Sequence, residues 1–145
     1  MKYLSIFAER LKDLMIEREL DSESLALKIG LDASGLRKYL RQEVFPSAKN
    51  AIKIADYFDC RLDYLFGLSE IFVLKNKKSG NPFSENFKTI LLRRNVSRYK
   101  FCADTGIPEQ SVADWFHSRR EPSMSNLIKT AEYFDCSIGF LLGRE

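Results

Sequence analysis

Three cations share one face of a short predicted helix, and they are the residues of this chain best suited to bind a partner. Arg37 and Arg41 are four residues apart and Lys38 lies beside Arg37, while the apolar residues of the same segment fall on the opposite side. Guanidinium and ammonium groups donate hydrogen bonds and accept none, so this face could bind an electron-rich partner. The alternative interpretation is an ordinary solvated helix face. The choice between them depends on the fold that carries the helix.

Residues suited to catalysis are scarce. His117 is the only histidine, it ends a predicted helix with no nucleophile beside it, and there is no glycine-rich phosphate loop. Cys60, Cys102 and Cys136 form no Cys-x-x-Cys pair, which argues against zinc and favours buried, reduced thiols. We therefore expect no enzyme activity, no cofactor and no metal.

The sequence consists of two copies of one unit. The stretch "DYFDCRLDYLFG" at 56–67 returns as "EYFDCSIGFLLG" at 132–143, 76 positions later. The register extends without a gap over 7–67 against 83–143, so loop lengths are kept as well as apolar positions. The predicted organisation is a first domain at 1–68, a linker at 69–81 and a second domain at 82–145.

Polar N-cap residues and glycine stops divide each copy into five short helices, and no segment has the alternation of a strand. In the first copy Asp21 caps a second helix at 22–29, Gly30 ends it, and Asp32 caps a third helix. The equivalent residues of the second copy are Ser97, Gly106 and Pro108, of which the proline is expected to preorganise the first helical turn. The fold class is therefore all-α.

The second and third helices, joined by a tight glycine turn, make a helix-turn-helix. The second copy, "TGIPEQSVADWFHSRREPSMSNLIKTAEYFDCSIGFLLG", resembles the lambda repressor-like (XRE) family in its TGIP turn, its tryptophan, its basic loop, its Pro-Ser cap and its LLG ending. The first copy matches with "SLALKIGLDASGLRKYL" and "PSAKNAIKIADYFDCRLDYLFG". The resemblance implies two tandem five-helix DNA-binding domains of prokaryotic or phage origin.

Two departures from the family concern the scaffold. The family usually has glycine at the end of the third helix, where Gln42 and Ser118 stand here. Many members also join the first and third helices by an arginine–glutamate pair. A packing contact is expected to replace this ion pair, because both partners are apolar and no buried charge is left over. The apolar replacements are Met15 with Leu40 and Leu91 with Phe116.

In the family the third helix lies in the major groove of DNA, and its early residues reach base edges. The resemblance therefore gives the first copy a DNA-facing set of Ala33, Ser34, Arg37, Lys38 and Arg41. Arginine and lysine at these places could donate to O6 and N7 of guanine. Ser22, at the start of the second helix, is placed like the family's phosphate contact.

The second copy has a different DNA-facing set. The equivalent places hold Glu109, Gln110, Ala113 and Asp114. Glutamine could read adenine and an acid could accept from cytosine N4, although two carboxylates near phosphates need compensating cations. Residues placed for backbone contacts lie nearby, at Arg98, His117, Arg119 and Arg120. The alternative is that this copy no longer reads DNA and serves dimerisation or partner binding.

Charge and hydropathy limit the choice of partners. The net charge of +3 is modest for a nucleic-acid binder, so affinity would depend on local patches. The apolar run Ile71–Leu74 is expected to dock on a domain or to pair two chains into a homodimer, and Lys75, Lys77 and Lys78 could contact phosphates or only solubilise the linker. The charged start and the lack of a long apolar run favour a cytoplasmic protein with no membrane span.

Together these patterns favour a sequence-specific DNA-binding transcriptional regulator that uses its two units on an asymmetric operator. The alternative is a protein-interaction adaptor or an antitoxin-like module on a helix-turn-helix scaffold. The cationic face around Arg37 favours the regulator.

Overall fold

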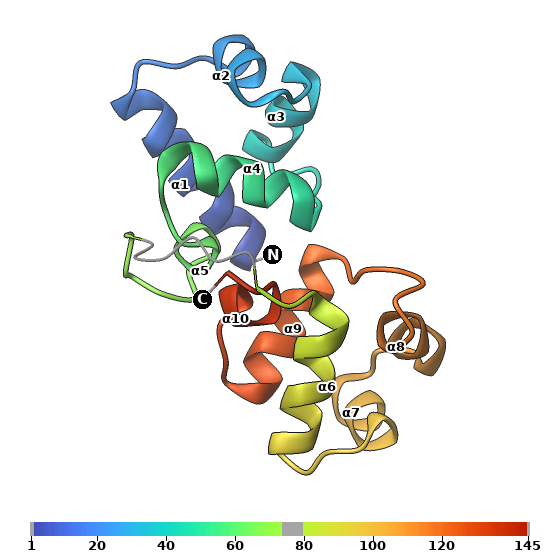
Figure 1. Cartoon of the computed structure of the whole chain (residues 1–145). Helices are drawn as coiled ribbons and strands as arrows, with labels where there is room; N and C mark the ends of the chain where they lie inside the picture. Colours follow the sequence, from blue (N-terminus) through green and yellow to red (C-terminus); the bar gives the residue numbers. More distant parts are fainter. Residues whose placement is uncertain (1, 74–79, 145) are drawn as a thin grey trace. The chain divides into compact units, whose positions relative to one another are not determined.

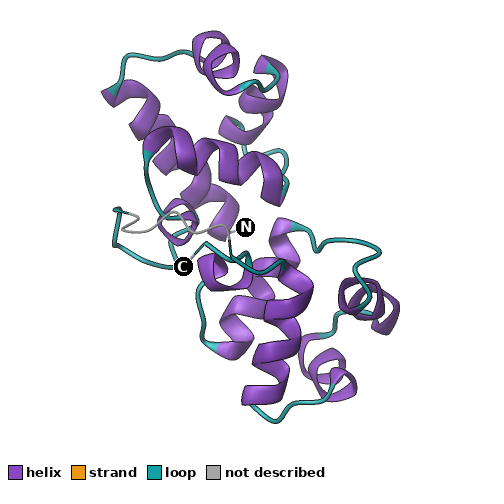
Figure 2. Cartoon of the chain, viewed as in Figure 1, coloured by secondary structure: helices purple, strands orange, loops and turns teal. Residues whose placement is uncertain are grey.

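The computed structural model describes residues 2–73 and 80–144, and it divides the chain into two compact units, Met1–Leu74 and Lys75–Glu145. These described residues form ten helices and no strand (Figures 1 and 2). The predicted all-α fold class, with two tandem helix-turn-helix units of five helices each, is therefore confirmed.

Unit 1 is divided into helices by the local signals in its sequence. The helices are α1 (Lys2–Glu17), α2 (Ser22–Ile29), α3 (Ala33–Leu40), α4 (Ala48–Phe58) and α5 (Leu62–Leu65). The Asp21 carboxylate accepts from the backbone N–H of Ser24 at 2.8 Å, and Gly30 ends α2 with a left-handed φ of 70°. Asp32 caps α3. Both caps and the glycine stop are as predicted, because each depends only on neighbouring residues.

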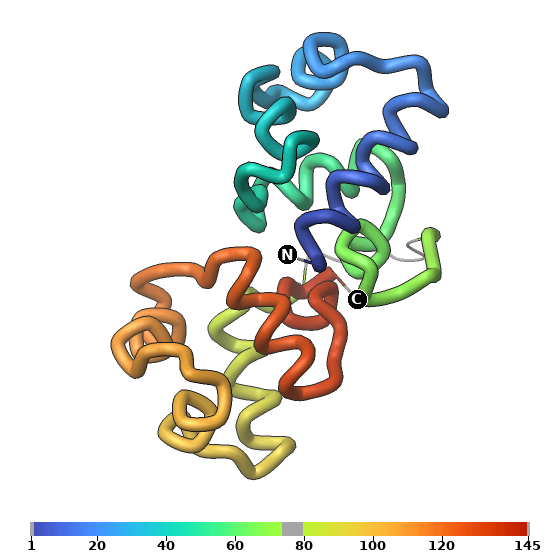
Figure 3. The backbone as a smooth tube through the Cα atoms, turned by 180° about the vertical axis from the view of Figure 1, so that it is seen from behind, coloured from blue at the N-terminus to red at the C-terminus, as the bar shows by residue number. Residues whose placement is uncertain are grey.

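Unit 2 repeats this order, as the tube in Figure 3 shows. Its helices are α6 (Phe83–Arg93), α7 (Arg98–Thr105), α8 (Glu109–Phe116), α9 (Met124–Phe134) and α10 (Ile138–Leu141). Ser97 caps α7 by accepting from the Lys100 N–H at 3.0 Å. Pro108 was expected in the first turn of α8, but it occupies the N-cap position with extended ψ, one residue before the helix begins.

The two positions where glycine is usual in the family keep a left-handed backbone. Gln42 has a φ of 61° and Ser118 a φ of 58°. For residues with a side chain this conformation costs about 1–2 kcal/mol. The turn after the third helix therefore keeps its shape in both units, although neither unit has the glycine. In unit 2 the Ser118 hydroxyl also shares a 2.9 Å hydrogen bond with the hydroxyl of Ser84 on α6.

Each unit has its own aromatic core. In unit 1 the Phe7 ring stacks on Phe66 at 4.9 Å between ring centroids and meets Tyr39 edge-on at 5.9 Å.

The expectation of buried, reduced thiols holds in part. All three cysteines are thiols outside any disulfide, and Cys60 and Cys102 are buried. Cys136 is only half-buried, so the repeat does not bury its two equivalent thiols equally.

The ends of the predicted linker are part of the units. Residues 69–73 return along unit 1, where the backbone N–H of Arg61 donates to the carbonyl of Phe72 at 2.9 Å. On the other side, the Gly80 N–H donates to the carbonyl of Gly143 at 2.8 Å. Leu74 and the three lysines at 75, 77 and 78, for which docking and phosphate contacts were predicted, lie outside the described residues.

Replacing Gly143 by alanine should destabilise unit 2 more than the same change at Gly106. Both glycines have left-handed φ angles, of 74° and 76°, so alanine is strained at either position. A Cβ at Gly143 would also lie 2.4 Å from the carbonyl oxygen of Asn81, whereas a Cβ at Gly106 meets no atom within 4 Å. The extra contact should cost about 1–3 kcal/mol.

Urea unfolding followed by the fluorescence of Trp115, the only tryptophan, measures this difference, because Trp115 lies within unit 2. Equal losses for the two variants would show that the segment around Asn81 does not cross Gly143.

Candidate nucleic-acid interface

The outer face of α3 is fixed by the residues that α3 buries. Leu36 is fully buried and Tyr39 is 7% exposed. The Tyr39 hydroxyl accepts from the side-chain amide of Asn50 on α4 at 3.0 Å, and its ring packs against α1. Because α3 also packs on α2, it is held on three sides, and only its polar face is left to solvent.

Two of the three cations on this outer face are paired with carboxylates from outside α3. Arg37 Nη2 donates to Glu23 Oε1 on α2 at 3.1 Å, and Arg41 donates to the carboxylate of Glu43 in the following loop. Lys38 makes no ion pair with any residue that the structure describes. Glu23 uses only one of the five N–H groups of the Arg37 guanidinium, so the remaining donors can still bind a partner.

Ser34 has a local role at the start of α3. Its hydroxyl donates to Asp32 Oδ2 at 2.6 Å, and its backbone N–H faces the other carboxylate oxygen at 3.4 Å. The hydrogen bond from the hydroxyl, aided by that backbone contact, lowers the pKa of Asp32. The predicted DNA-facing set of unit 1 therefore includes one residue whose hydroxyl already serves the N-cap.

In unit 2 an acid stands at the centre of the outer face of α8. Asp114 Oδ1 accepts from Arg119 Nε at 3.0 Å and from Gln110 Nε2 at 3.1 Å. The hydrogen bond from Arg119 is the main reason why the pKa of Asp114 is lowered. The compensation that the two acids were expected to need is present for Asp114, and it comes from the basic loop.

Two further cations cover the end of α8. The guanidinium of Arg98 lies 4.3 Å from the centre of the Phe116 ring, and the Lys88 ammonium lies 4.8 Å from the same centre. Phe116 and Leu91, the apolar replacements for the family's ion pair, both line a cavity of about 510 Å³ with these cations. The cations therefore cover an apolar ring that Leu91 alone does not bury.

The two units have opposite charges at equivalent places. Lys38 on α3 corresponds to Asp114 on α8, and Glu43 in the loop after α3 corresponds to Arg119. In unit 1 the loop acid Glu43 pairs with Arg41, the residue after α3, and in unit 2 the loop cation Arg119 pairs with Asp114 on α8. The same scaffold therefore presents two surfaces that would prefer different partner groups.

One repeat position beside the outer faces was not predicted from the sequence as part of the interface. It holds Glu23 in unit 1 and Tyr99 in unit 2, each the second residue of its helix. Glu23 binds Arg37, while Tyr99 is 74% exposed and borders a cavity of about 430 Å³ between α7 and α8. The repeat register could have revealed this position, because it directly follows Ser22 and Arg98, which were both selected.

The other selected residues all reach solvent at least in part. None of the selected residues is buried. Ser22, Ala33 and Ala113 are half-buried, whereas Glu109, His117 and Arg120 are exposed. Glu109 lines the cavity that Tyr99 borders, together with Cys102, whose pKa is raised by burial. In unit 2, therefore, residues from the start of α7 and from α8 line one cavity.

The comparison with protein families agrees with this geometry. A family model described as helix-turn-helix matches the chain twice, at residues 11–65 and 87–141. The chain therefore belongs to the helix-turn-helix family of the lambda repressor-like, or XRE, type, with two members of the fold in tandem. No curated protein and no solved structure matches the chain.

The family consists of DNA-binding domains and is not a family of enzymes. The two domains therefore suggest that this chain is a DNA-binding regulator. Among the described residues, no helix is long and apolar enough to cross a membrane. The same part of the chain contains no cluster of three or more histidine, cysteine or acidic residues that could hold a metal ion.

Replacing Asp114 by asparagine should strengthen binding to duplex DNA of random sequence several-fold. The change removes a negative charge from the outer face of α8 and leaves Arg119 with a weaker, neutral acceptor, which a phosphate can replace more easily. The slope of log K against log salt should become steeper by up to about 1. Fluorescence anisotropy over a series of salt concentrations measures both effects. Since the hydrogen bond lowers the pKa of Asp114, its carboxylate stays charged down to pH 5, and acidification to that pH does not reproduce the variant.

Asp104→Asn is the matched control. Asp104 also makes an ion pair, with Lys100 at 3.0 Å, but its second partner is the hydroxyl of Tyr133 on α9 and not a group on α8. Both variants change the net charge equally. Equal gains in affinity would mean that only net charge matters and that the outer face of α8 has no special role.

Proposed function

We propose that this protein is a sequence-specific DNA-binding transcriptional regulator, acting in the cytoplasm, whose two units bind two different half-sites of one asymmetric operator. The observation that carries the proposal is the reversal of charge between the outer faces of α3 and α8. Lys38 and Asp114 are equivalent in the repeat, and so are Glu43 and Arg119. Two units that bound the same half-site would need the same donors and acceptors at these places.

In unit 1 the proposed base contacts come from the outer face of α3. Arg37 and Lys38 would donate to guanine edges in the major groove, with Ala33 and Arg41 beside them. The hydrogen bond to Glu23 would restrict the orientation of the Arg37 guanidinium, so that its other N–H groups point toward the bases. Ser22, half-buried at the start of α2, is the proposed phosphate contact.

In unit 2 the proposed roles follow the polarity of each side chain. Gln110 and Ala113 would face the bases, and Glu109 or Asp114 could accept from cytosine. Gln110 and Asp114 hydrogen-bond each other in the free protein, so base contacts would replace this bond. The proposed backbone contacts are Arg98, His117, Arg119 and Arg120.

The proposed assembly is one chain on one operator, because a single chain already carries two units. The open alternative is a homodimer through the segment Ile71–Leu74. Its support is the exposure of Ile71 and Val73, at 62% and 61%, on either side of Phe72, which packs on unit 1. A DNA-bound complex of known stoichiometry distinguishes the two assemblies.

The first test is selection of a binding site from a random DNA pool, followed by Arg37→Ala. The variant should lose about 1–3 kcal/mol on the selected site and should relax the preference at one base pair, because a guanine contact is removed. Affinity is measured on the selected site, on its single-base variants and on a randomised duplex. An equal loss on every duplex would make Arg37 a phosphate contact only.

The second test concerns the two half-sites. Randomising either half of the selected site should weaken binding of the intact chain by about 100-fold or more, because the second contact is then no longer made at the high effective concentration of a tethered unit. Sedimentation of the protein–DNA complex gives its stoichiometry, with one chain per operator expected.

A palindromic site that binds two chains would instead support the homodimer. A chain that selects no sequence from the pool would contradict the regulator and would favour the interaction module.

A further inference from the structure

The chain does not leave unit 1 where its last helix ends. Cys60 and Val73 form an isolated antiparallel bridge, and the Arg61 N–H donates to the Phe72 carbonyl at 2.9 Å. The Phe72 ring meets the Tyr64 ring edge-on, with 5.0 Å between centroids. Residues 69–73 are therefore a folded extension of unit 1, although they come from the predicted linker.

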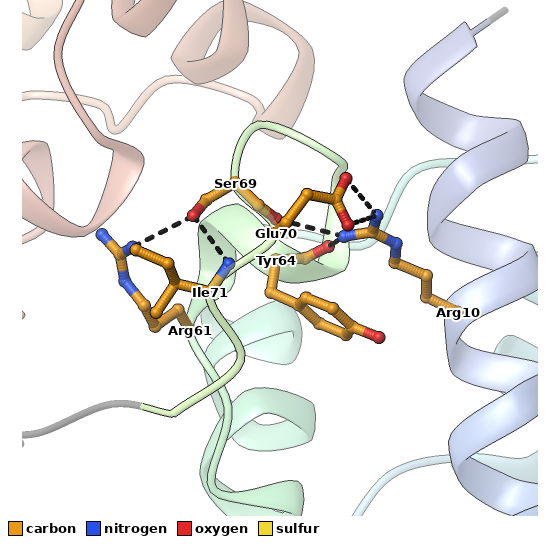
Figure 4. Close-up of polar contacts among 6 residues, drawn as sticks. All are labelled: Arg10, Arg61, Tyr64, Ser69, Glu70 and Ile71. Carbon is orange, nitrogen blue, oxygen red and sulfur yellow. Dashed lines mark hydrogen bonds and ion pairs between the residues drawn. The ribbon is translucent and has the colours of Figure 1, made fainter.

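One side chain of α1 donates several hydrogen bonds to this extension and to the end of α5 (Figure 4). Arg10 donates to both carboxylate oxygens of Glu70, at 2.9 and 3.0 Å, and to the carbonyl oxygens of Tyr64 and of Ser69, the latter at 3.2 Å. Its guanidinium also lies 4.2 Å from the centre of the Tyr64 ring. We call this set of four residues, Arg10, Tyr64, Ser69 and Glu70, the Arg10 latch.

The latch is supported from its other side. Ser69 Oγ accepts from Arg61 Nη1 at 3.2 Å and from the backbone N–H of Ile71 at 3.1 Å (Figure 4). The side chain of Arg10 is only 18% exposed, whereas that of Glu70 is 85% exposed. A change at Glu70 therefore removes an exposed side chain, whereas a change at Arg10 removes a half-buried one.

Unit 2 uses the equivalent position to hold the chain that enters it. Asn86 corresponds to Arg10, and its amide donates to the carbonyl of Asn81 at 2.9 Å and to that of Leu141 at 3.1 Å. With the Gly80–Gly143 hydrogen bond, these contacts fix the other end of the linker. One position of the repeat thus holds the departing segment in unit 1 and the arriving segment in unit 2.

These two attachments limit how far the units can separate. From Val73 to Gly80 there are seven Cα–Cα steps, which span at most about 25 Å. If the Arg10 latch opened, the free chain would begin near Leu68. The twelve Cα–Cα steps from Leu68 to Gly80 could span about 43 Å. The gain of about 18 Å corresponds to roughly five base pairs of duplex, at about ten base pairs per 34 Å.

We propose that Arg10 is a specificity-determining residue, because the Arg10 latch keeps the tether short and so limits the spacing of half-sites that one chain can bind. The inference rests on the proposed function, in which both units bind one operator. Arg10 acts on spacing through the segment that it holds, and it is not itself a DNA contact.

The test uses the full-length chain on a series of duplexes that carry both selected half-sites, with the spacer lengthened one base pair at a time up to ten. The wild-type affinity should fall at least about 10-fold beyond the optimal spacing, when the tethered contact is lost. Arg10→Asn, which gives unit 1 the residue of unit 2, should stay within about 3-fold of its best affinity for up to about five further base pairs. Glu70→Ala should act in the same direction and leaves the covered arginine in place.

Arg18→Ala is the matched control. Arg18 is the first residue after α1. Its guanidinium donates to the backbone carbonyl of Tyr57 at 3.3 Å and lies 5.4 Å from the centre of the Tyr57 ring. No contact joins it to residues 69–73 among those the structure describes. Its spacing profile should equal that of the wild type.

Two measurements separate the possible failures. Hydrogen exchange in the absence of DNA should be at least about tenfold faster at the Arg61 and Ile71 amides in Arg10→Asn than in the wild type, because both amides donate within the extension. Unchanged exchange, or an unchanged spacing profile in both Arg10→Asn and Glu70→Ala, overturns the proposal. A wild-type chain that binds neither half-site overturns the proposed function, and the spacing role with it, whatever the exchange shows.

Discussion

In each helix-turn-helix unit, one buried aromatic side chain attaches the third helix to the core. Tyr39 is 7% exposed and Trp115 is 3% exposed. The Trp115 ring lies 5.8 Å from both Phe83 and Phe87 between ring centroids. Helices of eight residues are too short to persist alone in water, so burial of this ring, and not helix propensity, keeps α3 and α8 in place. It also fixes which face of each helix remains in solvent.

On the outer faces, the acidic and basic side chains are distributed differently between helix and loop in the two units. The ion pair Arg37–Glu23 joins two exposed side chains, at 44% and 78% exposure, whereas in Arg119–Asp114 the arginine is 56% exposed and the aspartate only 15%. An exposed pair such as Arg37–Glu23 contributes about 0–1 kcal/mol to stability. In both pairs the arginine reaches solvent, so a phosphate or a base edge can compete with the carboxylate for its donors.

Equivalent positions of the two units make different contacts at the edges of the units as well as on their outer faces. Arg10 and Asn86 are equivalent, yet an arginine can join a carboxylate and two carbonyls at once, whereas an amide can join only two carbonyls. The helical scaffold tolerates both, because the first helix of each unit is positioned by its apolar face. Phe7 and Phe87, on that face, are fully buried. Arg10 is half-buried and Asn86 is buried, so this position has changed its partners within a packed part of the unit.

The sequence by itself determined the repeat and the bounds of α2 and α7, because a cap such as Asp21 acts on residues two or three positions away. It also indicated which residues would lie on the outer faces, since helical periodicity separates polar from apolar sides. Only the tertiary structure decided the pairings. Arg37 meets Glu23 across 14 positions, and Arg10 meets Glu70 across 60. Long charged side chains have many partners within reach and gain little from any one, so no local pattern specifies the choice, and the packing of the helices decides it.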